Sequence, residues 1–434
     1  MKYTSYWHDT APRFTGAAQG PVQGRCDVAV VGGGFTGLAA AYTLARAGAS
    51  VVVLEGSTVG AGASGRNGGH LNNGLAHSFP AAVEALGRER AVALYRSFDD
   101  AVDTIERLVA EENIDCAFRR SGKLKLASKP GHIAAIERNF EAIHREVDPD
   151  TALLRRADLA GEIVTDAAHG AMLFRKSAMM HMGRFVTGLA EAAVRQGATI
   201  HENAAVTGRR MAEGRHILQI TRDGMPGGEV SAGEVLLATG AYTGTYRGAP
   251  FQWFRRRIVP VGSFIVATRP LTENEIARTM PGNRTCVSSL NIGNYFRLAP
   301  DNRLIFGGRA RFSASSDQRS DAKSGAILRA ALARMFPQLG DVEIDYCWGG
   351  LVDMTRDRYP RAGREDGLWY AMGYSGHGAQ MSTQMGVVMA EAILGQADRN
   401  PVKGLNWPAV PGYSGKPWFL PLVGLYYKAL DRFR

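Results

Sequence analysis

The feature that most constrains this chain is a stretch near its start, DVAVVGGGFTGLAAAYTLARAGASVVVLE, from Asp27 to Glu55. The run DVAVV is rich in β-branched residues and predicts a strand, and FTGLAAAYTLARAG predicts a helix that ends at Gly48. SVVVLE predicts a second strand. A strand, a glycine-rich turn, a helix and a strand in this order form a βαβ unit of the kind that binds a dinucleotide.

The turn between the first strand and the helix has the pattern G-x-G-x-x-G at Gly32, Gly34 and Gly37. These glycines allow a tight turn, close approach of a pyrophosphate and packing of the helix on the strand. The helix N-terminus attracts the phosphate charge. Glu55 ends the second strand, where a carboxylate hydrogen-bonds the adenosine ribose hydroxyls and disfavours the 2′-phosphate of NADP.

Two further glycine-rich segments favour FAD over NAD, because an NAD dehydrogenase needs neither of them. GSTVGAGASGRNGGHLNNG follows Glu55, lacks helix or strand periodicity, and offers polar donors at Ser64, Arg66 and Asn67. GYSGHG follows the strand-like LWYAM and precedes the helix-like QMSTQMGVVMAEAIL. The positive end of that helix would suit a flavin near N1 and the C2 carbonyl, where negative charge develops on reduction, and His377 would add to it.

Four motifs carry a resemblance to a known family: GGGFTGL, GASGRNGG, VLLATGAYT and GYSGHG. Together they resemble the FAD-dependent D-amino-acid oxidase superfamily of amine and amino-acid oxidoreductases, which includes sarcosine and glycine oxidases. Within it the chain is most similar to the bacterial γ-glutamylputrescine oxidases, through SYW, RLAPDNRLIFGG, FPQLGDVEIDYCWGG and GLYYKALDR. The motifs and the resemblance imply that FAD contacts Gly32, Gly34, Phe35, Thr36, Gly37, Glu55, Gly62, Ala63, Ser64, Arg66, Asn67, Gly68, Gly69, Val206, Thr239, Gly240, Gly376, His377 and Gly378.

The expected fold class is α/β plus α+β, with a discontinuous Rossmann-type FAD-binding domain and a substrate domain on a mostly antiparallel sheet. We assign residues 25–84, 156–250 and 350–400 to the FAD-binding domain and residues 85–155 and 251–349 to the substrate domain. Residues 401–434 form a C-terminal extension. Apolar periodicity predicts one helix of the substrate domain from Ala322 to Met335.

Composition narrows the class of protein and its setting. The net charge of +10 is spread over short clusters without a dense aromatic and basic block, so nucleic acid is not an expected partner. No apolar run reaches the length of about 18 residues that a spanning helix needs, and the N-terminus lacks the apolar core of a secretory signal. Widely spaced Cys26, Cys116, Cys286 and Cys347 predict neither a metal site nor disulfides and fit a cytoplasmic location.

The predicted chemistry is oxidation of an amine C–N bond by hydride transfer to the flavin. The amine must be neutral, held against the ring and shielded from water, which aromatic side chains can achieve. The catalytic candidates are Tyr374, His377, Trp348 and His70. The candidates for contact with the substrate are Tyr295, Arg297, Arg309 and Gln380.

Departures from the family pattern refine the expectation. Sarcosine oxidases hold the substrate carboxylate with basic residues at the places where this chain has His70 and Gln380. This favours γ-glutamylputrescine or a related N-acylated polyamine, whose glutamyl group Arg297 or Arg309 would bind. No cysteine follows Trp348 in CWGGLVDMTRDRYP, so the FAD is expected to be non-covalent.

The electron acceptor and the substrate class stay open at this point. With O2 the products are an aldehyde, an amine or ammonia, and H2O2. One alternative is a dehydrogenase that passes electrons to a quinone or carrier, with peripheral membrane contact through the C-terminal PWFLPLVGLYYKALDRFR. Others are an amino-acid or N-methyl amino-acid oxidase, and a flavin-binding protein without catalysis.

Overall fold

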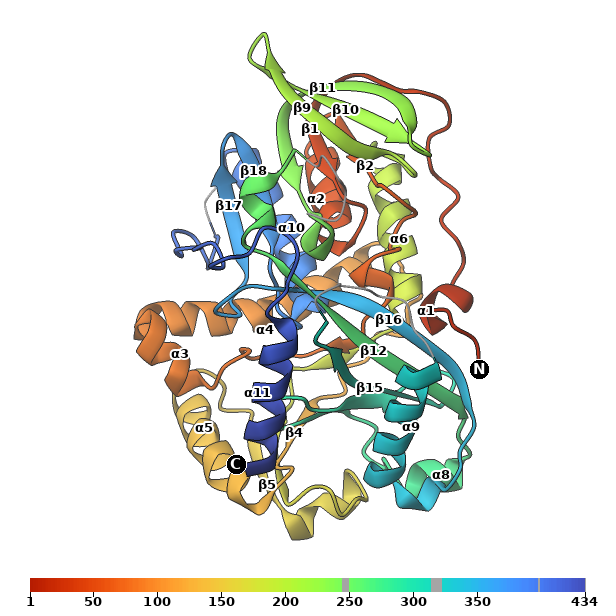
Figure 1. Ribbon diagram of the computed structural model, residues 1–434, viewed down its shortest axis with the longest axis vertical. Helices are drawn as coiled ribbons and strands as arrows, with labels where there is room; N and C mark the ends of the chain where they lie inside the picture. Colours follow the sequence, from red (N-terminus) through yellow and green to blue (C-terminus); the bar gives the residue numbers. More distant parts are fainter. Residues whose placement is uncertain (244–249, 314–321, 397–398, 434) are drawn as a thin grey trace.

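Two eight-stranded sheets organise the chain, and Figure 1 shows them one above the other. The computed structural model describes residues 1–243, 250–313, 322–396 and 399–433, apart from the side chains of residues 309 and 310. A third, small sheet pairs β3 (His70–Leu71) with β7 (Ala178–Met179).

The first sheet has a parallel centre in which β1 lies between β11 and β2. Its strands are β17 (Arg361–Glu365), β18 (Leu368–Met372), β11 (Met225–Leu237), β1 (Val22–Val31), β2 (Val51–Leu54) and β8 (Thr199–His201), with β10 (Arg215–Arg222) and β9 (Ala205–Ala212) extending antiparallel from β11. Parallel strands joined through helices confirm the predicted Rossmann-type unit.

Three helices pack together against this sheet: α2 (Phe35–Arg46), α6 (Met182–Arg195) and α10 (Gly378–Ile393). Nearly all of α2 is buried because its apolar residues are small enough to approach the sheet closely on one side and α6 and α10 on the other. The helix ends two residues before Gly48, whose φ of +90° supplies the left-handed turn that glycine adopts most easily.

The second sheet is antiparallel at every pairing except that of β13 with β4. Its order is β16 (Ile344–Met354), β12 (Val259–Pro270), β15 (Arg303–Arg311), β14 (Tyr295–Leu298), β13 (Thr285–Ser288), β4 (Lys123–Leu126), β6 (Gly170–Phe174) and β5 (Ala152–Arg155). This confirms the mostly antiparallel substrate sheet. One face packs on α9 (Ala322–Met335), whose bounds match the predicted helix, and the other face joins the core of the first sheet.

Two strands of the second sheet do not fit the predicted domain limits. β6 lies between β4 and β5, although residues 156–250 are assigned to the FAD-binding domain by sequence. β16 spans the predicted boundary at residue 350. The exact domain limits therefore stay a prediction.

The remaining helices surround the two sheets. They are α1 (Tyr6–Asp9), α3 (Phe79–Leu86), α4 (Arg88–Glu111), α5 (Ile133–Glu146), α7 (Gln252–Arg255), α8 (Glu273–Ala277) and α11 (Leu420–Phe433). The Asp431 carboxylate anchors α11 to the second sheet's side of the molecule by accepting hydrogen bonds from the backbone N–H groups of Asn291 and Ile292, both at 2.8 Å. Across the described ranges, no helix is both long and apolar enough to cross a membrane.

Candidate active site

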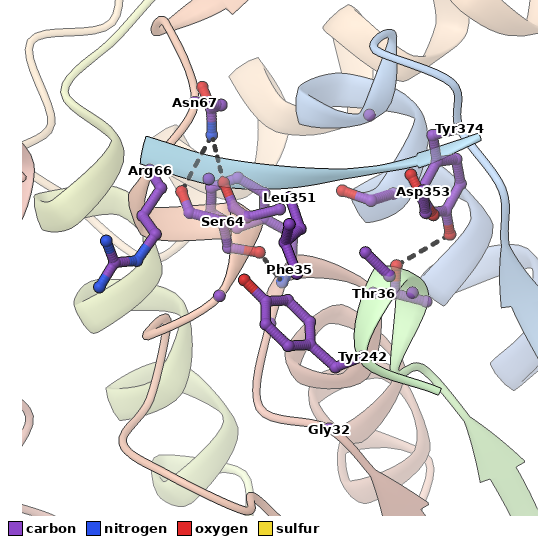
Figure 2. A pocket seen from close by; sticks show the side chains of 18 of the residues that line it. Gly32, Phe35, Thr36, Ser64, Arg66, Asn67, Tyr242, Leu351, Asp353 and Tyr374 are labelled. Carbon is purple, nitrogen blue, oxygen red and sulfur yellow. Dashed lines mark hydrogen bonds between the residues drawn. The ribbon is translucent and has the colours of Figure 1, made fainter. Parts of the chain in front are cut away.

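A cavity of about 760 Å³ is lined by residues of both large sheets. It begins at the N-terminus of α2, follows the glycine-rich loop after β2, passes β16 and reaches the N-terminus of α10. Figure 2 shows Arg66 and Asn67 toward one side of this cavity and Asp353 and Tyr374 toward the other. The three glycine-rich segments, far apart in sequence, thus meet at one site.

Most of the sequence-predicted site residues line the cavity. Those that do are Gly32, Gly34, Phe35, Thr36, Glu55, Gly62, Ala63, Ser64, Arg66, Asn67, Gly68, His70, Val206, Thr239, Gly240, Tyr295, Tyr374, Gly376, His377, Gly378 and Gln380. Gly37, Gly69, Arg297 and Trp348 are not among the lining residues. The side chain of Arg309 lies outside the part of the chain that the structure describes.

The turn before α2 has the geometry expected for a pyrophosphate. Gly32 has a φ of +114°, and a Cβ there would lie 2.7 Å from the carbonyl oxygen of Ala238, so glycine is required. The backbone N–H of Gly33 donates to the Glu55 carboxylate at 2.7 Å, and that of Phe35 donates to the Ser64 hydroxyl at 3.0 Å. Gly37 has the packing role, because a Cβ there would collide with the carbonyl oxygen of Gly32.

The glycine-rich loop is fixed to β16 by Arg66 and Trp348. The Arg66 guanidinium donates to the carbonyl oxygens of Ala61 at 2.7 Å and Gly349 at 3.1 Å. The indole N–H of Trp348 donates to the carbonyl oxygen of Arg66 at 2.9 Å. Trp348, predicted as catalytic, therefore lies where it positions the loop.

The N-terminus of α10 closes the other end of the cavity. Its first residues, from Gly378 to Gln380, line the cavity, and no side chain caps the helix from the N-cap position at His377. Burial lowers the pKa of His377 to about 4, with a smaller contribution from the charge of Lys123. Its Nδ1 atom is buried without a hydrogen-bond partner among the described residues, so this end of the cavity is ready to receive a polar group.

His70 and Gln380 lie in the cavity as neutral groups. Burial lowers the pKa of His70 to about 3, and Arg297 adds to this effect. Its two ring nitrogens face the carbonyl oxygens of Gly68 at 3.0 Å and Phe296 at 3.3 Å. Gln380 donates from its side-chain amide to the carbonyl oxygen of Asn72 at 2.6 Å.

Arg297 lies away from the cavity even though its neighbour Tyr295 lines it. The guanidinium donates to the carbonyl oxygen of Gly69 at 2.8 Å and lies 5.3 Å from the ring centroid of Trp7, and the residue is only 1% exposed. The Tyr295 hydroxyl lies 3.2 Å from that of Ser263. These contacts place the Arg297 guanidinium against the glycine-rich loop and outside the cavity lining, whereas Tyr295 lines the cavity.

Among the cavity residues that the sequence analysis did not single out, Asp353 and Tyr242 carry functional groups. The Asp353 carboxylate accepts a hydrogen bond from the Gly373 backbone at 2.6 Å, and burial raises its pKa to about 6. A lone acid in the apolar run GGLVDM was the available signal. The Tyr242 ring packs so closely on Gly62 that a Cβ there would lie 2.9 Å from it.

These features fit FAD. The cavity is long enough to join the dinucleotide turn at α2 with the uncapped helix end at α10, as an adenine dinucleotide carrying a flavin requires. Glu55 would hold the ribose, the N-terminus of α2 the pyrophosphate, and the N-terminus of α10 the pyrimidine side of the flavin. None of the four cysteines is among the lining residues, and all four are buried.

Comparison with known proteins agrees with this site. Residues 27–392 match the family described as FAD dependent oxidoreductase. The chain is 33% identical to γ-glutamylputrescine oxidoreductase of Escherichia coli over 94% of its own length and 93% of that protein. It is also 33% identical to the probable oxidoreductase OrdL of Haemophilus influenzae, over 94% and 92% of the two chains.

Among solved structures, glycine oxidase from Geobacillus kaustophilus superposes with a TM-score of 0.75 at 23% identity, covering 89% of this chain and 100% of the other. L-Proline dehydrogenase from P. horikoshii has a TM-score of 0.72 at 20% identity, covering 93% and 99% of the two chains. The predicted family, fold, enzyme class and cofactor are thereby confirmed. The chain belongs to the FAD dependent oxidoreductase family, and it is an FAD-dependent enzyme.

Proposed function

We propose that this enzyme oxidises the primary amine of a γ-glutamylated or similarly N-acylated polyamine, with γ-glutamylputrescine as the leading substrate and O2 as the acceptor. The overall reaction consumes the amine, water and O2 and releases an aldehyde, ammonia and H2O2. Bound FAD supplies the hydride acceptor for the carbon next to the nitrogen. The E. coli relative named above carries this substrate in its name.

The observation that carries the proposal is the charge pattern of the cavity. Arg66 is the one cationic side chain among the described lining residues, and its guanidinium is used by two backbone carbonyl oxygens. His70 and Gln380 are neutral at pH 7, because the pKa of His70 is about 3. A small amino acid would bring its carboxylate next to the reacting carbon, and among the described lining residues Arg66 is the single cation, already bonded to backbone carbonyls.

Three lining residues of the cavity supply the environment that amine oxidation requires. Burial keeps Tyr374 and Tyr295 as neutral phenols, since it raises the pKa of both. Together with Ile265, which also lines the cavity, they would exclude water and favour a neutral amine. If the amine releases its proton to solvent before it binds among these side chains, no charged side chain is needed to accept that proton.

Oxygen consumption tests the proposal. The purified holoenzyme should consume O2 with γ-glutamylputrescine and release the aldehyde and H2O2 in equal amounts. Free putrescine, glycine and sarcosine should react at least about a hundred-fold less efficiently, which corresponds to about 2.7 kcal/mol of transition-state binding. Efficient oxidation of glycine or sarcosine would instead establish an amino-acid oxidase.

A membrane quinone is a second candidate for the electron acceptor, because α11 exposes an apolar face that could lie on a membrane. Leu422, Leu425 and Phe433 are 64%, 63% and 81% exposed, with Lys428 and Arg432 beside them. This pattern suits the surface of an anionic membrane, where a quinone would accept the electrons. Sedimentation with vesicles containing phosphatidylserine, and flavin reoxidation by ubiquinone-1 faster than by O2, would replace the oxidase proposal with a dehydrogenase.

A further inference from the structure

One row of residues across the second sheet leads from the cavity to Lys125, a half-buried lysine. In the register of the sheet, Ile265 and Tyr295 both pair with Gly307, Tyr295 pairs with Val287, and Val287 pairs with Lys125. Directly paired residues project to the same face of a sheet. Because Ile265, Tyr295 and Val287 all line the cavity, Lys125 projects to the cavity side of the sheet, one strand beyond Val287.

Among the residues that the structure describes, no carboxylate balances the charge of Lys125. Its ammonium donates to the carbonyl oxygen of Ser288 at 2.9 Å. No acidic side chain of the described residues contributes to its titration, whereas burial and then Arg358 lower its pKa to about 8. Both Lys125 and Arg358 also act on His377, which lines the cavity, so this corner is positive from several directions.

The neighbouring Lys123 is different, because acidic groups face it. Asp99 and Asp148 both stabilise its charged form, and its ammonium lies 3.8 Å from the ring centroid of Phe174. The same two carboxylates pair with Lys176 at 2.9 and 3.6 Å. Lys123 therefore belongs to a balanced network, whereas no carboxylate of the described residues pairs with Lys125.

We propose that Lys125 binds the carboxylate of an elongated amine substrate whose other end is oxidised beside Tyr295 and Tyr374. The proposal rests on the proposed function and names the group that recognises its glutamyl end. The strand of Lys125 lies two strand spacings, or about 10 Å, from that of Tyr295. In γ-glutamylputrescine about nine bonds separate the reacting carbon from the α-carboxylate, a span of roughly 11 Å. In glycine a single bond separates them.

The first test compares Lys125→Met with the control Lys323→Met, an exposed lysine on α9. The substrates are γ-glutamylputrescine and N-(4-aminobutanoyl)putrescine, which lacks only the α-carboxylate. Lys125→Met should raise KM for γ-glutamylputrescine by about ten-fold or more and leave kcat/KM for the second compound within about two-fold. Lys125→Arg should retain most of the preference for the substrate with the carboxylate. Lys323→Met should leave KM and kcat/KM for both substrates unchanged. Equal losses on both substrates, or on neither, would overturn the proposal.

The second test does not depend on turnover. γ-Glutamylbutylamide carries the glutamyl group but lacks the terminal amine of the putrescine part, which is the amine proposed to be oxidised, and its binding to the holoenzyme can be followed by calorimetry. Its Kd should rise by about ten-fold or more in Lys125→Met. Equal Kd values in the wild type and the variant would contradict the role of Lys125. If the wild type binds this compound through Lys125 but γ-glutamylputrescine does not reduce the flavin, the anion site stands and the proposed function fails.

The stability of Lys125→Met separates ligand binding from a structural role. Lys125→Met removes a half-buried ammonium that no described carboxylate balances, so the thermal midpoint of the ligand-free holoenzyme should stay unchanged or rise. A lower midpoint together with weaker binding of every compound would assign Lys125 to the fold.

Discussion

The hydroxyl groups of Thr36 and Tyr374 lie 2.8 Å apart, although 338 positions separate them in the chain. Thr36 is in the first turn of α2 and Tyr374 is in the turn before α10. Figure 2 shows this contact at one side of the cavity. It therefore links the segment that would hold the pyrophosphate to the segment that would hold the flavin ring.

The first prediction concerns this contact. Thr36→Val and Tyr374→Phe each remove one buried hydroxyl and leave the other without its partner, so each should lower the free energy of unfolding by about 1 kcal/mol. The free energy of unfolding lost by the double variant should be about 0.5–1.5 kcal/mol smaller than the sum of the losses in the two single variants. Urea denaturation at saturating FAD measures the cycle. Strictly additive losses would show that the two hydroxyls do not interact.

Glu55 supports a prediction on cofactor affinity. Its carboxylate accepts hydrogen bonds from the backbone N–H groups of Gly33 and Ser57, which leaves lone pairs for the ribose hydroxyls. Glu55→Gln should weaken FAD binding by about ten-fold, or 1.4 kcal/mol, in titrations of the apoprotein by flavin fluorescence. Glu213→Gln, which changes an exposed carboxylate outside the cavity lining, is the control. Unchanged affinity in Glu55→Gln would remove Glu55 from the FAD site.

A pH prediction follows from His181, the N-cap residue of α6. Burial lowers its pKa to about 3, and its Nδ1 accepts a hydrogen bond from the Arg184 backbone at 3.2 Å. Between its ordinary pKa of about 6.5 and this value, the unfolded chain binds a proton that the folded chain does not. The free energy of unfolding should therefore fall as the pH falls through this window, by about 1 kcal/mol per pH unit.

Asp353 has the opposite effect on the pH dependence of stability. Burial raises its pKa to about 6, so the folded chain binds this proton at a higher pH than the unfolded chain does. The His181 effect is therefore best measured as the difference in pH dependence between the wild type and His181→Gln. From pH 6.5 to pH 4, the free energy of unfolding should fall further in the wild type than in the variant, by about 1 kcal/mol for each pH unit. Parallel profiles would mean that His181 titrates normally in the folded protein.

Dissociable FAD is a further expected outcome. The four cysteines are buried, and none is among the described cavity-lining residues. Acid precipitation of the holoenzyme should release all of its flavin into the supernatant. Yellow colour and fluorescence retained by the precipitated protein would show a covalent bond.

Local patterns predicted the parts of the fold that depend on nearby residues. The order of strand, glycine turn, helix and strand from Asp27 to Glu55 appears as β1, α2 and β2, and the periodicity from Ala322 to Met335 gives the bounds of α9. In both cases the buried face of a helix is fixed by side-chain spacing along one segment.

Long-range pairing could not be predicted in the same way. Lys125 projects to the cavity side because β4 pairs in parallel with β13, some 160 residues later, and no local pattern fixes that register. For Arg297 the strand could be predicted, but the position of the side chain could not. Its strand was predicted as part of the substrate sheet, but a carbonyl oxygen of Gly69 and the ring of Trp7 hold its guanidinium away from the cavity.

The most direct test of the proposed function is anaerobic reduction of the flavin. The purified holoenzyme would be mixed without O2 with γ-glutamylputrescine or with free putrescine, and the absorption of the oxidised flavin followed in time. We predict rapid bleaching by γ-glutamylputrescine and little or none by putrescine, because only the first carries the carboxylate that Lys125 would bind. Bleaching by neither compound would contradict the polyamine assignment and leave an FAD enzyme for another amine.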